Sequence, residues 1–587
     1  MNHVHPPRPR LALNVGITGH RATLLAPSVI QELAPSVDEV FRQLRAAALR
    51  LHDAEAAIFD AGSIELRLHT PLATGADQLA AQSARASNYQ IRALLPFAPD
   101  NYRTDFAQGE ERNQFEAELA AADGWFALPG DRAADEGAYV LVGKAVIAAA
   151  DILVAIWDGR EGNGPGGTAH VVDLALANSV PVIHIMVDPD GPTMGQTRLL
   201  VGGDAVEPVM QPIESPHDYD ALLKDTLAPH TADERAHIED YFRESTQPRN
   251  WRVEYPLLLA VLGVKSLPRH PLREAPPEQL DPNENGGGEQ QLAAYNWANS
   301  LAIRYAQLFR SGHVANYFLS ASAVILALLG LLVPSVKVFL VMAELGAIGL
   351  LFSNTKAGRN GEWHRRWLQY RHLAESLRPL PYLKRSGLIS TPFRSDFVQG
   401  AGHREGGADW TRWYAAAIWR EMGSPTGVVT DADIASLASA FTTEQMLPQA
   451  QYHRVNAGRM HKLDHRLHEV GNFLTGAVIA VCILFLIGFV VLHSWVVRLT
   501  DGFIFLTAGL PAVGAAVFGL RGHGEHLLAA SRSASTAASL EAMAARLTAA
   551  NDAEELAHGL EHGASIMLAD LNEWTIAYRE RSLEIPG

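Results

Sequence analysis

The chain contains very little cysteine. Cys482 is the only one among 587 residues, and it lies within an apolar run. A single cysteine excludes an intramolecular disulfide and any cysteine-based metal cluster built from one chain. We therefore predict no metal site, and the composition suits a reducing compartment such as the cytoplasm.

A net positive charge is also absent, because the formal net charge is −16. Proteins that bind nucleic acid usually carry a basic footprint, since neutralisation of phosphates supplies much of their affinity. We therefore expect no nucleic-acid partner. The first residues lack the apolar core of a signal peptide, and no turn ends in the Gly-Lys-Ser/Thr of a Walker A motif.

Long apolar runs are what the chain does have. They lie at 316–333, 336–353, 473–492 and 503–520. Each has about 18 to 20 residues, the length that crosses roughly 30 Å of hydrocarbon as a helix. Within each pair the connection is short, so the sequence predicts two transmembrane hairpins.

Basic residues gather at one end of these runs. The short turns between paired runs carry few of them, whereas the opposite ends carry Arg304, Arg310, Lys356, Arg359, Arg365, Arg366, Arg371, Arg378 and Arg521. The positive-inside tendency places both termini, the middle segment and the soluble half in the cytoplasm.

Changes in composition along the chain predict five parts. Residues 1–200 form an α/β half, and 201–289 form a helical connector with a Pro- and Gly-rich linker. The first hairpin and its cytoplasmic helices occupy 290–400, a cytoplasmic helical segment occupies 401–470, and the second hairpin with C-terminal helices occupies 471–587. The similar layout of the two hairpins suggests an internal duplication.

One acidic residue, Glu344, lies within the second predicted span. A carboxylate is costly in hydrocarbon and usually faces the interior of a bundle or water. Glu344 either lines a polar seam that serves ions or protons, or it is protonated or hydrogen-bonded at a helix–helix contact.

The first half alternates short apolar runs with helical stretches. The runs lie at 11–18, 66–72, 91–96, 151–157 and 181–187. This alternation is typical of a parallel sheet flanked by helices. In such sheets ligands sit beyond the carboxyl ends of the strands.

Glycine-rich turns follow three of these runs: "GITGHR" from Gly16, "ATGAD" from Ala73, and "WDGREGNGPGGTA" from Trp157. Glycine lets backbone amides approach an anion closely, and a helix N-terminus adds a favourable dipole. Gly166, Gly167 and Thr168 form the strongest case, with Thr168 as helix N-cap or phosphate donor. Any one of these turns could equally be a plain tight turn.

These motifs resemble the SLOG superfamily, the Rossmann-like relatives of the DprA and LOG proteins. The resemblance covers roughly residues 11–190. It rests on Gly16 to Arg21, Thr74 to Asp77, Leu95 to Phe97 with Tyr102 to Phe106, Trp157 to Gly159, and Gly166 to Thr168. It implies a nucleotide or nucleotide-derived signal as ligand, such as an ADP-ribose derivative or a cyclic nucleotide, and no other cofactor.

The expected ligand-binding residues all belong to these motifs or lie near them. Arg21 is expected to contact a phosphate, and Asp77 and Asp158 to contact a ribose or base, although each could simply brace its turn. The full set is Gly16, Thr18, Gly19, His20, Arg21, Thr74, Gly75, Ala76, Asp77, Arg103, Tyr139, Asp158, Gly159, Gly164, Gly166, Gly167 and Thr168.

One departure from the family pattern bears on catalysis. LOG phosphoribohydrolases carry Pro-Gly-Gly-x-Gly-Thr-x-x-Glu, whereas here Pro165-Gly166-Gly167 runs straight into Thr168 and Val171 stands where the glutamate would be. Glu161 and Asp173 are near but out of register. We therefore expect no catalytic residue, and a loop that binds without hydrolysing.

The second half resembles the SLATT-type two-helix effector modules of bacterial conflict systems, mainly in layout and in "QYRHLAESLR" from Gln369. Together the two resemblances imply a multi-pass protein of the bacterial inner membrane that senses a nucleotide signal from a separate enzyme. It would act as a homo-oligomer that disrupts the membrane in antiphage defence. The alternatives are a membrane-tethered nucleotide hydrolase or phosphoribohydrolase, and a nucleotide-regulated channel or transporter.

Overall fold

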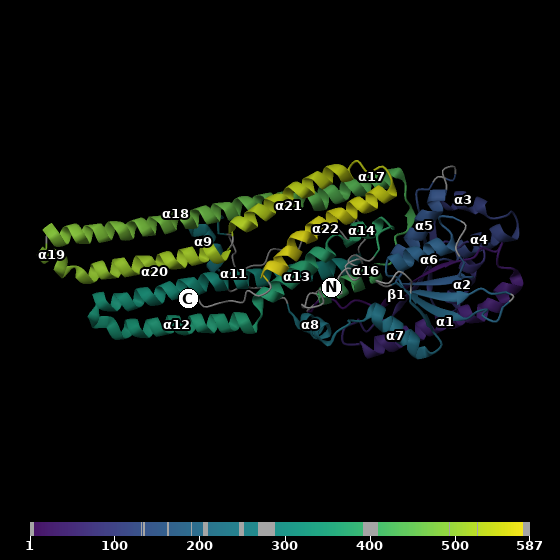
Figure 1. Cartoon of the computed structure of the whole chain (residues 1–587), viewed down its shortest axis with the longest axis horizontal. Helices are drawn as coiled ribbons and strands as arrows, with labels where there is room; N and C mark the ends of the chain where they lie inside the picture. Colours follow the sequence, from purple (N-terminus) through teal and green to yellow (C-terminus); the bar gives the residue numbers. More distant parts are fainter. Residues whose placement is uncertain are drawn as a thin grey trace.

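The computed structural model describes residues 5–130, 132, 136–160, 164–189, 191–202, 209–245, 252–267, 288–390, 409–491, 493–524 and 526–578. An α/β half lies at one end of an elongated molecule. Long helices extend from the other end, and shorter helices lie between the two (Figure 1). Most of the predicted linker, residues 268–287, lies outside the described residues.

A mostly parallel sheet forms the centre of the α/β half. Its order among the described residues is β8-β7-β6-β5-β1-β2-β3-β4-β9. The five predicted strands are confirmed as β1 (Ala12–Gly19), β2 (Glu65–Thr70), β3 (Gln90–Leu95), β5 (Ile152–Trp157) and β6 (Val182–Met186). They pair in parallel, with β1 between β2 and β5. The α/β fold class is therefore correct.

Four further strands extend this sheet. β4 (Gly124–Ala127) is parallel to β3, and β7 (Thr197–Val201) and β8 (Val209–Pro212) add an antiparallel edge. The opposite edge is β9 (Gly427–Val428), which pairs with β4 although it is some three hundred residues further along the chain. The sheet thus continues past the predicted boundary at residue 200.

Helices cover both faces of the sheet. One face packs against α1 (Pro27–Ala54) and α2 (Ala76–Ala86), and the other packs against α5 (Glu136–Ala149) and α6 (Thr168–Ala177). Between β3 and β4 lie α3 (Pro99–Tyr102), a 3-10 turn (Arg103–Asp105) and α4 (Glu110–Ala120).

The predicted connector contains three helices. α7 (Pro216–Leu227) and α8 (Ala232–Arg243) each begin with a capping box, Ser215 with Asp218 and Thr231 with Glu234. These boxes satisfy amide groups that a helix start leaves without partners. The short apolar helix α9 (Glu254–Val261) follows.

The helical half contains four helices that, within the described residues, are long and apolar enough to cross a membrane. α11 (Gly288–Leu332) and α12 (Lys337–Asn360) contain the first predicted pair of spans, joined by a 3-10 turn at Pro334–Val336. α18 (Leu447–Val491) and α20 (Thr500–Gly524) contain the second pair, joined through α19 (His493–Arg498). Residue 492, the last of the third predicted span, is not described.

The four long helices lie in a row rather than around a common centre. α12 packs on α11, α11 on α20, and α20 on α18 (Figure 1). Their outward sides are apolar and exposed, as Phe339 on α12 and Phe473 on α18 show. Such a surface suits contact with lipid tails.

Polar side chains connect the two helices of each membrane-length pair at the end nearest the α/β half. On α11, Asn316 is buried and its amide donates to Thr355 Oγ1 of α12 at 3.0 Å, while Asn354 donates to Asn316 Oδ1 at 2.7 Å. In the second pair Arg521 of α20 makes a two-pronged ion pair with Asp464 of α18, at 2.9 and 3.1 Å.

The layer between the two ends consists of helices that follow or precede the long ones. They are α13 (Trp363–Leu377), α14 (Leu380–Arg385), α16 (Asp409–Met422), α17 (Asp431–Ala440), α21 (His526–Leu547) and α22 (Ala553–Tyr578). On α16, Trp410, Tyr414 and Trp419 are buried, so this aromatic segment serves packing. The ring of Trp410 lies 5.1 Å from that of Tyr241 on α8.

One helix connects the sheet with the far end of the molecule. Three residues after β9, α17 begins at Asp431, capped by Thr430. It continues through a π-helical turn, Phe441–Met446, into α18, so that the helix is unbroken from Asp431 to Val491. The membrane-length segment is therefore continuous with the edge of the sheet.

Candidate functional site

Backbone hydrogen bonds bring the first two glycine turns together at the carboxyl edge of the sheet. The N–H of Ala76 donates to His20 O at 3.1 Å, and that of Ala22 donates to Thr74 O at 3.2 Å. Gly75 has φ +97°, and a Cβ there would lie 2.7 Å from both Ala22 N and His20 O. Only glycine fits this position without displacing the neighbouring turn.

The third turn joins the same edge through β1 and β5. The N–H of His20 donates to Ile156 O at 3.0 Å. At Gly19 a Cβ would lie 2.4 Å from the Cβ of Ala76 and 2.7 Å from Ile156 O. All three turns therefore meet at one edge, as the sequence predicts for neighbouring parallel strands.

His20 and Asp158 connect the first and third turns. His20 Nε2 lies 3.2 Å from Asp158 Oδ1 and 3.3 Å from the backbone nitrogen of Asp158. Asp158 Oδ1 also accepts from Arg160 N at 3.1 Å. Asp158 thus braces its own turn, and the next residue, Gly159, is exposed with φ +79°.

Arg21 and Tyr139 carry polar groups at the centre of this edge. The guanidinium carbon of Arg21 lies 5.4 Å from the centre of the Tyr139 ring. Its side chain is exposed and makes no hydrogen bond or ion pair among the described residues. A cation held over an aromatic face but not neutralised is free to meet an anion.

Tyr139 is held by Asp105, which the motif quoted above contains but which was given no role in the site. The Tyr139 hydroxyl donates to Asp105 Oδ2, and Arg132 Nη2 lies 2.7 Å from Asp105 Oδ1. Burial raises the pKa of Tyr139 to about 12, and the hydrogen bond to Asp105 adds to this. No periodic pattern in the sequence marks Asp105 or Arg132.

Asp77 lies beneath the second turn. Its side chain is buried, and its Oδ2 accepts from Ala73 N at 3.1 Å. Burial raises the pKa of this carboxyl to about 7, although the Ala73 N–H and the charge of Arg21 oppose the shift. The neighbouring Ala76 is fully buried as the first residue of α2, and its N–H already donates to His20 O, so it supports the turn.

The glycine loop before α6 presents backbone amides. Gly164 and Gly166 have φ of +149° and +81°, and the N–H of Gly166 donates to His170 Nδ1 at 2.9 Å. The N-cap of α6 is Gly167, which has no side chain to cap the helix, and Thr168 is the first helical residue. Thr168 is therefore not the N-cap, and the amides at the start of α6 have no side-chain acceptor at the cap position.

Several predicted residues lie away from this cluster. Gly16 is buried in β1, where a Cβ would lie 2.9 Å from Val146 of α5, so this glycine serves helix–sheet packing. Arg103 lies 3.7 Å from Asp100 and 4.0 Å from Glu116. Thr18 is half-buried at the end of β1.

Two residues, Glu161 and Asp173, are the candidate acids of the alternative hydrolase hypothesis. Glu161 lies outside the described residues. Asp173 is exposed on α6 and makes no hydrogen bond or ion pair within the described part of the chain. Val171, at the position of the missing glutamate, is buried against Gly143 of α5 and does not point to the loop.

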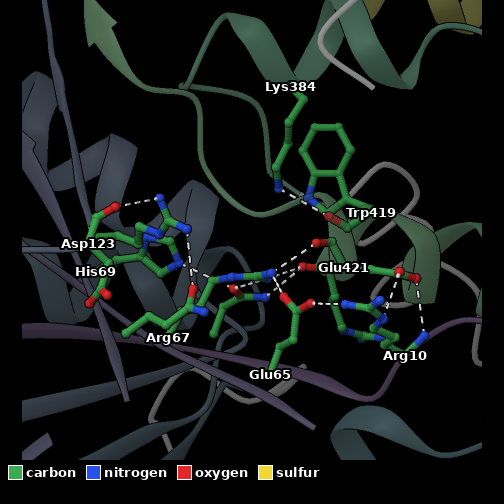
Figure 2. Close-up of polar contacts among 12 residues, drawn as sticks. Arg10, Glu65, Arg67, His69, Asp123, Lys384, Trp419 and Glu421 are labelled. Atoms are coloured by element: carbon green, nitrogen blue, oxygen red, sulfur yellow. Dashed lines mark hydrogen bonds and ion pairs between the residues drawn. The ribbon is translucent and has the colours of Figure 1, made fainter. Parts of the chain in front are cut away.

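The opposite edge of the sheet, at the amino ends of the strands, holds the helical half. Arg67 of β2 donates to the carbonyl oxygens of Arg420 and Glu421 on α16, at 2.8 and 3.0 Å, and pairs with Glu65 (Figure 2). Burial lowers the pKa of Arg67 to about 10. Arg10 completes the network by pairing with Glu65 at 3.0 Å and donating to Glu421 from its backbone at 3.1 Å.

One further ion pair crosses this junction, and a cation–π contact lies beside it within the helical half. Arg420 Nε lies 2.8 Å from Asp151 Oδ1. The other carboxylate oxygen of Asp151, Oδ2, accepts a hydrogen bond from Asn14 N at 3.0 Å. The ammonium of Lys384 on α14 lies 4.0 Å from the centre of the Trp419 ring (Figure 2). The α/β half is thus attached to the helices by the edge that the glycine turns leave free.

No cluster of three or more potential metal ligands occurs among the described residues. No family model matches the chain, and no curated protein matches it.

Proposed function

We propose that this chain is a membrane-anchored sensor of a nucleotide-derived ligand, such as an ADP-ribose derivative or a cyclic nucleotide. The observation that carries the proposal is the meeting of three glycine turns around Arg21, whose side chain makes no hydrogen bond or ion pair among the described residues. The same chain carries four helices of membrane length at its other end.

The chemistry of the edge favours a phosphate-bearing ligand. Arg21 and the amides at the N-terminus of α6 attract an anion. The space beside Gly167 is open to such an anion, because the nearest atom to a Cβ added there would be 3.5 Å away. The carboxylates of Asp158 and Asp105 are acceptors of the kind that ribose hydroxyls or a base amino group require. Binding, without hydrolysis, is the activity we assign to this edge.

Ligand binding could be communicated to the long helices through the sheet. Ligand binding can change the helices only if the ligand has a higher affinity for one of two states of the protein. The junction at Arg67 and Arg420 and the continuous helix from β9 through α18 provide physical contact between the α/β half and the long helices. The output is then a change in how α11, α12, α18 and α20 pack.

The cellular setting of the proposal comes from the resemblance described above. The protein lies in the bacterial inner membrane with its termini and α/β half in the cytoplasm, and a separate enzyme makes the ligand during phage infection. Since the four long helices lie in a row, one chain cannot enclose a pore. Several copies must therefore assemble to permeabilise the bilayer.

The decisive experiment is mass spectrometry of small molecules released from the purified full-length protein. We expect a nucleotide derivative in the wild type and its loss in Arg21→Gln, with Arg42→Gln on α1 as an exposed control. Equal retention of the compound by both variants would remove the carboxyl edge from the site. If ligand-loaded wild type left the membrane potential of cells unchanged, the effector role would be wrong.

A further inference from the structure

After its first residue, Glu254, the helix α9 is apolar on all sides. The ten residues from Tyr255 to Val264 contain no charged side chain. A helix without a polar face belongs in a protein core or in a membrane. About ten residues are too few to cross a bilayer, so a segment of this length suits a core or an interfacial position.

Only one side of α9 is covered by protein. Leu259 is buried against Leu463 and Leu467 of α18. On the other side Leu257 is 50% exposed and Val261 is 76% exposed, one turn further along. A core helix would bury such neighbouring aliphatic side chains, since full burial of each contributes about 1.5–3 kcal/mol and partial burial only a fraction of that.

The position of α9 matches the ends of the long apolar runs. The N–H of Tyr255 donates to Ser311 Oγ of α11 at 3.3 Å. Ser311 precedes the first predicted span by about five residues, and Leu467 precedes the third by about six, which is ~8 to 9 Å along a helix. The interfacial layer beside the hydrocarbon is roughly 5 to 8 Å thick, so these two contacts lie at its outer limit. Val517, within the fourth predicted span, packs against the same cluster as Leu259, so α9 extends from there to the edge of the hydrocarbon. Figure 1 shows α9 beside α11, α18 and α20.

One cation contacts α9 directly, since the guanidinium carbon of Arg310 lies 5.5 Å from the centre of the Tyr255 ring. Others lie near the same ends of the long helices. Lys265 follows the helix, and Lys356 and Arg359 lie near the end of α12. All three are exposed and carry no ion pair among the described residues. The acidic residue of α9, Glu254, is paired with Arg252 at 2.9 Å. The surroundings therefore attract the phosphates of anionic lipids.

We infer that α9 is an interfacial helix that lies in the headgroup layer of an anionic bilayer, with Leu257 and Val261 inserted among the acyl chains. Lipid, rather than a second copy of the chain, is the occupant because α9 packs beside Val517 of the fourth predicted span, next to long helices whose own exposed side chains are apolar. The inference rests on the proposal that those helices span the membrane. A helix held this way fixes the depth of α11 and α18 in the bilayer.

Nitroxide quenching in vesicles tests the depth of α9. The full-length protein with Cys482→Ser carries a single new cysteine labelled with an environment-sensitive fluorophore, in vesicles of phosphatidylcholine and phosphatidylglycerol. Leu257→Cys is the test position. Leu484→Cys, 64% exposed within the third span, and Leu447→Cys, 43% exposed at the start of α18, are matched leucine controls.

We expect the Leu257 label to be quenched several-fold more by a headgroup nitroxide than by one at the acyl-chain end. The Leu484 label should show the reverse, and the Leu447 label neither. Val261→Cys provides a second position on the same side of α9. A Leu257 label that behaved like the Leu447 label, while Leu484 was quenched, would overturn the role of α9 alone. An unquenched Leu484 label would overturn the spanning helices and this inference together.

Discussion

Arg21 lies over the Tyr139 ring with 5.4 Å between the guanidinium carbon and the ring centre, although Arg21 is in the turn after β1 and Tyr139 is on α5. Tyr139 is itself fixed by Asp105 and Arg132. The cation is thus oriented by an aromatic face and not by a carboxylate, which leaves its hydrogen-bond donors available for a ligand.

Gly167→Asp should weaken ligand binding at least tenfold, about 1.4 kcal/mol. It places a carboxylate at the N-cap of α6, where we expect a phosphate. Gly167→Ala is the matched control, because a Cβ there meets nothing closer than Gly164 O at 3.5 Å, and it should bind as the wild type does. Calorimetry with ADP-ribose and cyclic nucleotides measures both variants, and equal affinities would remove this loop from the site.

The protein should not consume its ligand. Val171, at the position of the family's glutamate, is buried away from the loop, and Asp173 is exposed without a described contact to it. We expect no free base or ribose phosphate after incubation with excess ligand, monitored by chromatography. Product amounting to many molecules per protein would favour the hydrolase alternative.

Asp77 should make stability depend on pH. Burial raises the pKa of its carboxyl to about 7, from 3.8 in the unfolded chain. The unfolded chain loses this proton first as pH rises, so the folded state loses up to ~1.4 kcal/mol per pH unit between these values. The cost is fully present above pH 7. The advantage in melting temperature of Asp77→Asn over wild type should therefore grow from pH 5 to pH 7 and then level off, and a constant difference would contradict the assignment.

Arg420→Met should destabilise the junction between the two halves. It leaves Asp151, which is 2% exposed, without its ion pair, and removing one partner of a buried pair costs ~3 kcal/mol. We expect a melting temperature lower by several degrees. The control Arg42→Met breaks an exposed ion pair with Glu39 and should change the melting temperature little. Equal melting temperatures for the two variants would show that the junction is not held by this pair.

Glu344→Leu should insert at least as well as wild type but depolarise membranes less. Glu344 is half-buried, three and seven residues before the buried Ala347 and Leu351, and so lies on the side of α12 that faces α11. Met342→Leu, on an exposed position of the same helix, is the control. Depolarisation of ligand-induced cells by Glu344→Leu at the wild-type rate would refute its role in a polar seam.

The sequence predicted those parts of the fold whose residues repeat a local pattern. The five predicted strands are short segments rich in apolar residues, and the glycine turns that follow three of them mark the carboxyl edge. β9 could not be predicted, because Gly427 and Val428 become a strand only by pairing with Phe126 and Ala127. In the site, the same holds for Asp105 and Arg132, which meet Tyr139 only through the fold of the chain after β3.

The unbroken helix from Asp431 to Val491 works as a lever arm. Its 61 residues extend for about 90 Å at 1.5 Å per residue. A tilt of about 3° where it leaves β9 would move the far tip sideways by roughly 5 Å, about half the distance between the axes of packed helices. A change at the edge of the sheet too small to alter strand pairing is therefore large enough, at the other end, to alter how the tip of α18 packs against α20.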